Sequence, residues 1–513
     1  MKIVLFGLPA SGKGTQSNNI LNKYGIPQLS TGDMLRRLAK EEDSILGKEI
    51  REIPVGHFAN DELIIKCIKE ELKKDIYTNG VVFDGFPRTE TQAKKMIEMG
   101  IIPDIVVLLK ANENSLVERI INRRIHEPSG RSYNIISDPP KIEGKDDITG
   151  EPLVHRSDDN HEFISKRIND FNKKTYPAFL KLKELCQYGS GPILIEVDSN
   201  RDQKNVWEDL NTGIKSAIAI QKIREKPVFT FMQAPYDEKN KYQQEIALRS
   251  AMHDCLMRGE IPFCSSLLYH QENMLGINEK KKIISFINKK FIDNFDKVAL
   301  YISTNLLDNK NTITRKINGS PVILDRESSE MIDYAFKKGK KIEIYNLDSY
   351  QTDNSLPLNN YDININNHKE ILLEEETFDN IKNNNEFVII ESPYAGTPTE
   401  ISKNEHYARS AIVDCLIRGE IPIASHLLYT QPGILDDTQS AQRRLGIEAG
   451  LITGKICTKT VCYIDMGITK GMEEGLEKAK NEGRSFEKRS LPFFNDEYEN
   501  NFRNKLTKKI KIK

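Results

Sequence analysis

The sequence has few cysteines, almost no net charge and no long apolar run. Its seven cysteines include no Cys-x-x-Cys pair, and an odd, unpatterned set favours a reducing cytosol over a disulfide framework. With 74 basic and 75 acidic side chains the formal net charge is -1, so no overall positive field favours nucleic acid. No apolar run approaches the roughly 18 residues of a membrane span. We therefore expect a cytoplasmic protein with neither a nucleic-acid nor a membrane partner.

The 513 residues are enough for about three domains. Over residues 1–215, short apolar strands at 2–6, 81–84, 105–109 and 193–197 alternate with helical stretches. This alternation predicts an α/β fold, with helices on both faces of a parallel sheet. Residues 124–160 are rich in Pro, Gly, Asp and Ser and break the alternation, so we expect an inserted subdomain there.

The second half of the chain contains an internal repeat. Residues 249–262 (RSAMHDCLMRGEIP) return as residues 409–422 (RSAIVDCLIRGEIP), with 11 of 14 positions identical. The repeating unit is about 120 residues long, which indicates a duplicated domain and not a solenoid. We predict two Rossmann-like α/β domains, at 227–346 and 387–513, joined by an Asn-rich linker at 347–386.

The segment at 7–15 (GLPASGKGT) has the pattern of a phosphate-binding loop between a strand and a helix. Its glycines let consecutive backbone N–H groups point at a phosphate chain, and the following helix N-terminus adds positive potential. Lys13 is placed to reach the β- and γ-phosphates. A glycine-rich turn is the structural alternative, but the strand, loop, lysine and helix occur together here.

Further residues point to phosphoryl transfer. Asp84 ends an apolar strand, where a carboxylate is suited to hold Mg²⁺ through water, and Arg88 follows it in the segment DGFPR. The planar donors of arginine suit the spread negative charge of a transferring phosphoryl group, and four arginines flank the insertion: Arg119, Arg123, Arg156 and Arg167. A solvated basic face is the alternative, and we accept it for Arg124.

Residues 1–215 resemble long-form adenylate kinases from end to end. The matching segments are GLPASGKGTQ, STGDMLR, FDGFPRT with Gln92, RRIHEPSGRSYN, DPPKIEGKDDITGEPLVHRSDD and Lys166-Arg167. The resemblance implies a P-loop kinase domain with an AMP-binding helical region at 30–59 and a LID at 122–159. It also implies the reversible, Mg²⁺-dependent conversion of ATP and AMP into two ADP.

The resemblance assigns roles to individual residues. The ATP side would comprise Ala10, Ser11, Gly12, Lys13, Gly14, Thr15, Arg119, Arg123, Ser132, Tyr133 and Arg201. The AMP side would comprise Thr31, Arg36, His57, Phe58, Ala59, Gly85, Phe86, Pro87, Arg88, Gln92, Arg156 and Arg167. Within these sets the catalytic residues would be Lys13, Arg88, Arg123, Arg156 and Arg167, and Asp84 would hold Mg²⁺ through water. The sequence departs from the pattern at His57, where a lysine is common, and in the spacing around Arg201.

Some relatives hold the LID with a zinc ion bound by cysteines. The equivalent positions here are His126, Ser129, Asp146 and Thr149, a poor zinc set that resembles the hydrogen-bonded quartet of zinc-free relatives. We predict no structural zinc, and we expect Asp158 and Asp159 to help close the LID.

The duplicated domains more weakly resemble nucleoside 2-deoxyribosyltransferase-like Rossmann-type domains. Those transferases use a Glu at the start of the last helix as nucleophile, assisted by an Asp at the end of the preceding strand. In the second copy Asp465 and Glu474 are the candidates, although Gly475 stands where the glutamate is expected. An acidic helix start that only favours the helix dipole is the alternative.

Three hypotheses follow. The chain is a kinase fused to an enzyme acting on nucleosides or nucleotides, or a kinase with a non-catalytic nucleotide-binding module, or its kinase part prefers another nucleoside monophosphate. Gln92 favours AMP, since its side-chain amide can both donate to and accept from the adenine edge. We expect ATP, AMP and ADP as small-molecule partners. The kinase part is expected to be monomeric, with C-terminal domains that pair with each other or oligomerise.

Overall fold

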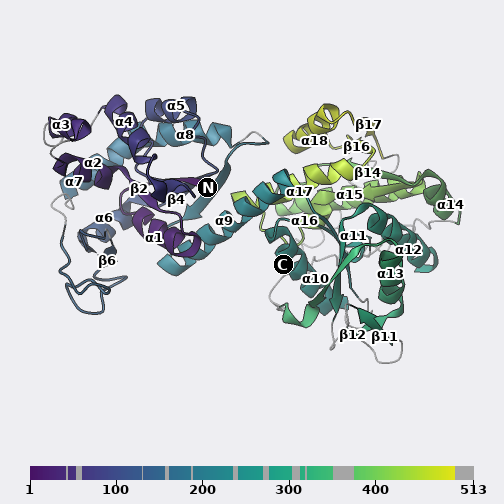
Figure 1. Cartoon of the computed structure of the whole chain (residues 1–513). Coiled ribbons are helices and arrows are strands. Elements are labelled where there is room, and N and C mark those ends of the chain that lie inside the picture. The colour runs from purple at the N-terminus through teal and green to yellow at the C-terminus, as the bar shows by residue number, and fades with distance from the viewer. Residues whose placement is uncertain are drawn as a thin grey trace, which may run out of the picture. The chain divides into compact units, whose positions relative to one another are not determined.

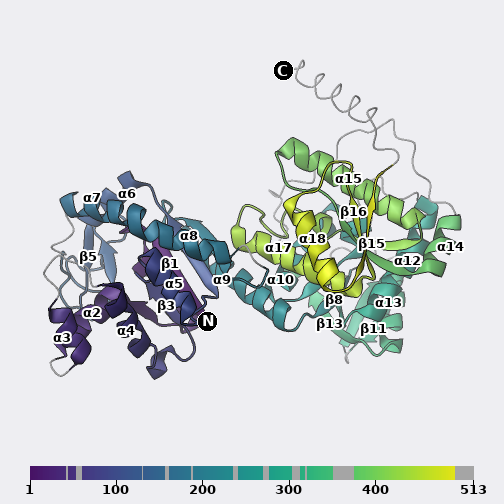
Figure 2. The ribbon, with the colours of Figure 1, turned by 90° about the horizontal axis from the view of Figure 1, so that it is seen from above.

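The fold is taken from a computed structural model, which describes residues 1–41, 44–52, 60–129, 131–155, 161–186, 189–234, 241–269, 277–302, 312–317, 320–350 and 375–491. The chain divides into two compact units (Figures 1 and 2). Unit 1 comprises residues 1–217 with 439–441, and unit 2 comprises residues 218–438 with 442–513. Among the described residues, no helix is long and apolar enough to cross a membrane.

Unit 1 is built on a five-stranded parallel sheet with the order β2-β3-β1-β4-β7. The strands are β1 (Lys2–Gly7), β2 (Gln28–Ser30), β3 (Val81–Asp84), β4 (Ile105–Lys110) and β7 (Ile193–Asp198). The inner strands are almost continuously apolar because both of their faces are buried. The predicted α/β fold with a parallel sheet is confirmed.

Helices cover both faces of this sheet (Figure 1). Helices α1 (Lys13–Tyr24) and α9 (Gln203–Glu225) lie on one side, and α4 (Asp61–Glu71), α5 (Glu90–Glu98) and α8 (Tyr176–Leu185) pack into one apolar core on the other. Helices α2 (Thr31–Lys40) and α3 (Ile45–Arg51) form a flap that packs on α4. Polar side chains start several of these helices: Ser30, Asn60 and Thr89 each accept a backbone N–H in the first turn.

The predicted insertion carries a small antiparallel sheet of β5 (Arg123–Ile125) and β6 (Ser132–Asn134). Helix α6 (Glu113–Ile121) leads into it, and α7 (His161–Asp170) follows it. A π-helical turn, η2 (Phe171–Thr175), joins α7 to α8, and a short 3₁₀ turn, η1 (Asp75–Tyr77), precedes β3.

Unit 2 contains two four-stranded parallel sheets, one from each copy of the repeat. The first, in the order β13-β10-β8-β9, contains β8 (Phe229–Gln233), β9 (Ile261–Phe263), β10 (Lys297–Ile302) and β13 (Lys341–Asn346). The second, in the order β15-β14-β16-β17, contains β14 (Glu386–Glu391), β15 (Glu420–Ile423), β16 (Lys459–Tyr463) and β17 (Ser485–Arg489). In each sheet, the second strand pairs with one side of the first strand, and the third strand pairs with its other side. The carboxyl end of the first strand therefore borders a topological switch point.

Equivalent helices surround the two sheets. Repeat 1 has α10 (Lys241–Met257), α11 (Ser265–Tyr269), α12 (Ile277–Asn294) and α13 (Arg326–Lys337); repeat 2 has α15 (Pro398–Ile417), α16 (Ser425–Tyr429), α17 (Ser440–Thr453) and α18 (Lys470–Asn481). Repeat 1 also has a hairpin, β11 (Thr312–Ile317) with β12 (Ser320–Asp325). Within the segment expected to be a linker, η3 (Leu347–Ser349) and helix α14 (Glu375–Asn384) are formed, and residues 351–374 lie outside the described part of the chain.

The two repeats contact each other through a reciprocal pair of hydrogen bonds. The Tyr269 hydroxyl of repeat 1 donates to the carbonyl of Pro422 in repeat 2 at 2.6 Å, and the Tyr429 hydroxyl of repeat 2 donates to the carbonyl of Pro262 at 3.1 Å. Both tyrosines are fully buried. Because the same two positions of the repeat are used on each side, the contact has the form of a twofold-symmetric interface within one chain.

Replacing Tyr269 and Tyr429 together by Phe should destabilise unit 2. Each change leaves a buried carbonyl without its donor, at a cost of about 1–3 kcal/mol per group. Urea titration of the full chain measures the resulting change in the free energy of unfolding. The same change at exposed Tyr176 is the control and should alter stability by less than about 0.5 kcal/mol. Equal stability of the double variant and the control would show that these bonds contribute nothing.

Candidate active site

The loop between β1 and α1 lies at the carboxyl end of the central strand and lines a large pocket of unit 1. Gly12 caps α1 with a φ of 95°, a left-handed conformation that glycine adopts without steric cost. Ser11 is buried at the base of the loop, and its amide donates to the carbonyl of Leu8 at 3.1 Å. The predicted loop residues 10–15 all line this pocket.

The Lys13 side chain folds back into the loop. Its ammonium group donates to the carbonyls of Gly7 at 2.8 Å and of Leu8 at 3.0 Å. Burial lowers the pKa of Lys13 to about 8; Asp84 opposes this effect, and the nearby charges of Arg88, Arg167 and Arg123 add to it. The structure thus brings four predicted cations to one place, where an anion would relieve their mutual repulsion.

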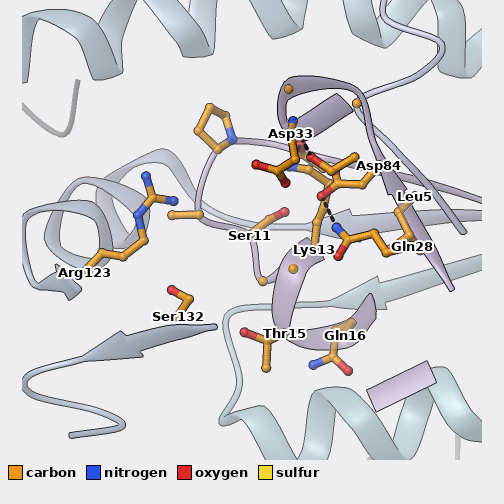
Figure 3. Close-up of a pocket in the computed structure, with 18 of the residues that line it drawn as sticks. Leu5, Ser11, Lys13, Thr15, Gln16, Gln28, Asp33, Asp84, Arg123 and Ser132 are labelled. Atoms are coloured by element: carbon orange, nitrogen blue, oxygen red, sulfur yellow. Dashed lines mark hydrogen bonds between the residues drawn. The ribbon is translucent and has the colours of Figure 1, made fainter. Parts of the chain in front are cut away.

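Asp84 ends β3, beside the loop. One carboxylate oxygen accepts a hydrogen bond from the Gln28 side chain of the neighbouring strand β2 at 2.8 Å (Figure 3). Gln28 was not predicted from the sequence, because its contact depends on the pairing of β2 with β3. Figure 3 also shows Arg123 and Ser132 on the other side of the loop from Asp84.

A second cluster forms around the Gly85 carbonyl. It accepts from the Thr31 hydroxyl at 2.9 Å and from Arg88 Nε at 3.0 Å. Gly85 has a φ of 77°, and a Cβ there would lie 2.7 Å from the Thr31 hydroxyl and 2.8 Å from Arg88 Nη2. Only glycine fits this position, so the predicted DGFPR segment has a steric reason for its glycine. Burial lowers the pKa of Arg88, while Asp84 raises it.

Gln92 is buried and held from both sides. Its side-chain oxygen accepts from the Arg88 amide at 2.8 Å, and its side-chain nitrogen donates to Asp61 at 2.8 Å. Thr89 donates to the other Asp61 oxygen at 2.9 Å. Because an ionised carboxylate only accepts, Asp61 determines which way the Gln92 amide points. Asp61 was also missed, since it lies 31 residues away in the sequence.

The four predicted LID residues lie together. His126 contacts Ser129 at 2.7 Å and Thr149 at 3.3 Å, and Thr149 donates to Asp146 at 3.0 Å. Two residues absent from the prediction complete the network: Glu151 contacts His126 at 2.6 Å, and Arg131 binds both oxygens of Asp146. The Arg131 guanidinium is the main cause that holds the pKa of Asp146 well below its usual range.

Other predicted ATP-side residues are engaged within the protein. Arg119 donates to the Ser199 carbonyl at 2.8 Å, Arg201 pairs with Asp209 at 2.6 Å, and the Tyr133 hydroxyl donates to Asp146 at 2.9 Å. Side chains that line the pocket include Ser132, Tyr133, Arg36, Pro87, Arg119, Arg123, Arg167 and Arg201. Phe86 is buried in the core below them. The predictions for His57, Phe58, Ala59, Arg156, Asp158 and Asp159 fall outside the described residues.

In unit 2, Asp465 follows β16, and its carboxylate accepts from the Tyr407 hydroxyl at 2.5 Å and from the Leu491 amide at 2.9 Å. Glu474 lies in α18 and is half-buried. Among the described residues, no hydrogen bond joins Asp465 to Glu474.

Comparisons with known proteins separate the two halves of the chain. Residues 5–184 match the family described as adenylate kinase, and residues 386–489 match one described as a domain of unknown function (DUF7768). The adenylate kinase of Sodalis glossinidius is 46% identical over 178 residues, which cover 34% of this chain and 83% of that protein. The adenylate kinase of Francisella philomiragia is 39% identical over 217 residues, which cover 42% of this chain and 100% of that protein.

Replacing Asp146 by Ala should loosen the predicted LID alone. The change removes the acceptor shared by Arg131, Tyr133, Thr149 and the amide of Ile148. Amide hydrogen exchange should accelerate across 125–155 and stay unchanged in β1 and β3. The adjacent Asp147→Ala, which removes one hydrogen bond from the Lys141 amide, is the matched control. Equal exchange in both variants would contradict a LID held by Asp146.

Proposed function

This chain belongs to the adenylate kinase family, a family of nucleoside-monophosphate kinases, and we propose that unit 1 catalyses the reversible transfer of a phosphoryl group from ATP to AMP. The observation that carries the proposal is the placement of Lys13. Its ammonium group is confined inside the loop, with Asp84 and the charges of three arginines acting on it. Phosphoryl transfer needs such positioned charge more than it needs covalent chemistry.

The ATP phosphates would bind the backbone N–H groups of residues 10–15. Lys13 would exchange its bonds to the Gly7 and Leu8 carbonyls for phosphate oxygens. Arg123 and Arg167 approach the same pocket from β5 and α7. They would neutralise the charge that spreads over the transferring group, together with Arg88 and Arg156.

The site also fits Mg²⁺. This ion prefers oxygen ligands and keeps several of its waters, and Asp84 presents a carboxylate beside the loop with one oxygen bound by Gln28. Mg²⁺ supplies charge neutralisation at the phosphates. Asp84 would hold its waters, and Gln28 would fix the orientation of the Asp84 carboxylate.

AMP would occupy the opposite side of the pocket, near Thr31, Arg36, Gly85 and Arg88. The cluster on the Gly85 carbonyl positions Thr31 and Arg88. The amide of Gln92, oriented by Asp61, keeps one N–H and one lone pair for the adenine edge. This arrangement supports AMP as the acceptor over CMP, UMP and GMP.

We also propose a zinc-free, long-form LID, a monomeric kinase unit and a cytoplasmic location. The hydrogen-bonded quartet of His126, Ser129, Asp146 and Thr149 supports the first. The seven cysteines support the last, because all are free thiols and free thiols persist in reducing compartments.

For unit 2 we propose two alternatives. The first is an activity on nucleosides or nucleotides that uses Asp465 and Glu474. The second is a non-catalytic module that binds nucleotides. The position of Asp465 after β16, at the carboxyl edge of the sheet, favours repeat 2 for either role. Release or exchange of a base by the full chain, tested over a panel of deoxynucleosides and deoxynucleotides, would support the activity. Nucleotide binding without turnover would support the module.

Replacing Lys13 by Ala should lower kcat/KM for ADP formation by about 10²–10³-fold, since one preorganised cation is lost. Thermal melting should change little. Lys23→Ala, at the exposed end of the same helix, is the matched control and should retain full activity. Full activity in Lys13→Ala would refute the assigned role.

Replacing Asp61 by Ala should release the Gln92 amide. We expect KM for AMP to rise about tenfold, as for a lost hydrogen bond to a charged group, with a smaller effect on KM for ATP and on kcat. The preference for AMP over CMP should fall in parallel. Initial rates with both acceptors measure this, with Asp75→Ala as an exposed control. An unchanged KM for AMP, or a wild-type enzyme that prefers CMP, would overturn the base assignment.

A further inference from the structure

A buried carboxylate joins the flap of unit 1 to helix α4. Glu71 is the last residue of α4 and is 7% exposed. Its Oε2 atom accepts a hydrogen bond from Arg37 of α2 and lies 2.9 Å from the ammonium group of Lys74. Burying a charged carboxylate is costly unless charged partners and hydrogen bonds compensate for the lost water. The position of Glu71 therefore needs a reason.

Tyr77 completes the surroundings of this carboxylate. Burial raises the pKa of Tyr77, the charge of Glu71 and a hydrogen bond to it add to this effect, and Arg37 opposes it. Tyr77 belongs to η1, which precedes β3, the strand that ends in Asp84. Arg37, Glu71 and Tyr77 all line the large pocket of unit 1. Glu71 thus connects three segments that border this pocket, α2, α4 and η1.

The bond between Glu71 and Arg37 differs from the other contacts that attach the flap to α4. Glu49 of α3 and Lys66 of α4 also form an ion pair, but it is 3.8 Å long and its side chains are 40% and 60% exposed. Exposed pairs of this kind contribute little. Met34 and Leu38 of α2 pack into the apolar core with α4, and apolar burial is not directional. The charge-assisted bond to Glu71 is directional, so it fixes how α2 is rotated on α4.

Two neighbouring arginines of α2 are held in opposite ways. Arg37 binds a carboxylate whose side chain is 9% exposed. Arg36 binds Asp33 of its own helix, and both of these side chains are 62% exposed. An exposed pair can exchange its partner at little cost, whereas breaking a buried pair leaves an uncompensated charge. Consecutive helical side chains point about 100° apart, so the bond that holds Arg37 also sets the direction of Arg36.

We propose that Glu71 is a positioning residue for AMP: it commits Arg37 to the fold and leaves Arg36 as the arginine of this pair that exchanges its partner for the AMP phosphate. The inference rests on the kinase reaction proposed for unit 1. Glu71 acts through Arg37 and the orientation of α2, which also carries Thr31. The effect of Glu71 is therefore confined to AMP, because the ATP phosphates would bind the loop at 10–15.

Replacing Glu71 by Gln keeps the shape of the side chain and removes its charge. We expect KM for AMP to rise about tenfold, as for a lost hydrogen bond to a charged group, with kcat and KM for ATP at their wild-type values. Initial rates with each nucleotide varied in turn measure this. Glu49→Gln removes the exposed ion pair between the flap and α4 and is the matched control. An unchanged KM for AMP in Glu71→Gln, or equal rises in KM for both nucleotides, would overturn the proposal.

A double-mutant cycle tests whether Glu71 acts through Arg37. Arg37→Gln changes a side chain that is 43% exposed, so it carries the test if thermal melting shows that Glu71→Gln folds poorly. Both single variants should raise KM for AMP, and the double variant should raise it no further, because the two residues share one bond. Effects that multiply in the double variant would contradict a role through Arg37.

Amide hydrogen exchange without nucleotide gives a readout that does not depend on turnover. Exchange should accelerate across residues 31–41 in Glu71→Gln and stay unchanged in β1 and β4. Unchanged exchange in α2 would refute the positioning role, even in an active enzyme. A wild-type chain that forms no ADP from ATP and AMP would instead refute the reaction proposed for unit 1. The exchange experiment would then still decide whether Glu71 holds α2.

Discussion

The Lys13 ammonium group, held between two carbonyls of its own loop, is the interaction around which unit 1 is organised. Burial removes water from this cation and so disfavours its charged form, which lowers the pKa of Lys13 to about 8. Asp84 offsets part of it from the end of β3, while three arginine charges increase it. A site that concentrates positive charge in this way is stabilised by a polyanion, and so the free protein is already arranged for its substrate.

The duplication in unit 2 rests on a different constraint. The buried hydroxyls of Tyr269 and Tyr429 each donate a hydrogen bond to a proline carbonyl of the other copy. These two hydrogen bonds require both copies to keep the same backbone conformation at that place. The segment containing Pro262 and Pro422 is accordingly nearly identical in both. Positions at the carboxyl edges of the two sheets are not bound by this pairing. The copies differ there: two residues before the shared Pro-Tyr segment, repeat 1 has Gln233 and repeat 2 has Glu391.

Local patterns were sufficient to predict part of this molecule. The loop at 7–15, the DGFPR segment and the LID quartet are short motifs whose residues lie close together in the sequence, or in segments with a recognisable family pattern. Gln28, Asp61 and Glu391 were not predicted. Gln28 meets Asp84 through the register of two strands, Asp61 meets Gln92 through the packing of α4 on α5, and Glu391 meets Gly475 across 84 residues. Each of these contacts depends on tertiary structure that no local window contains.

The carboxyl edges of the parallel sheets in unit 1 and in repeat 2 differ in their electrostatics. In unit 1 the carboxyl edge collects fixed cations, because phosphates bring charge with them. In repeat 2 the first strand ends in a carboxyl, that of Glu391, whose pKa burial raises to about 8, and the hydroxyl of the next residue, Ser392, lies 2.8 Å from the His426 ring. A phosphate that approached Glu391 would disfavour the ionised form of its carboxyl, and the positive charge that acts on Glu391 comes from Arg484 and not from a lysine of a strand-helix loop. The two edges therefore differ in the charge that they present to a ligand, although they occupy the same place in a parallel sheet.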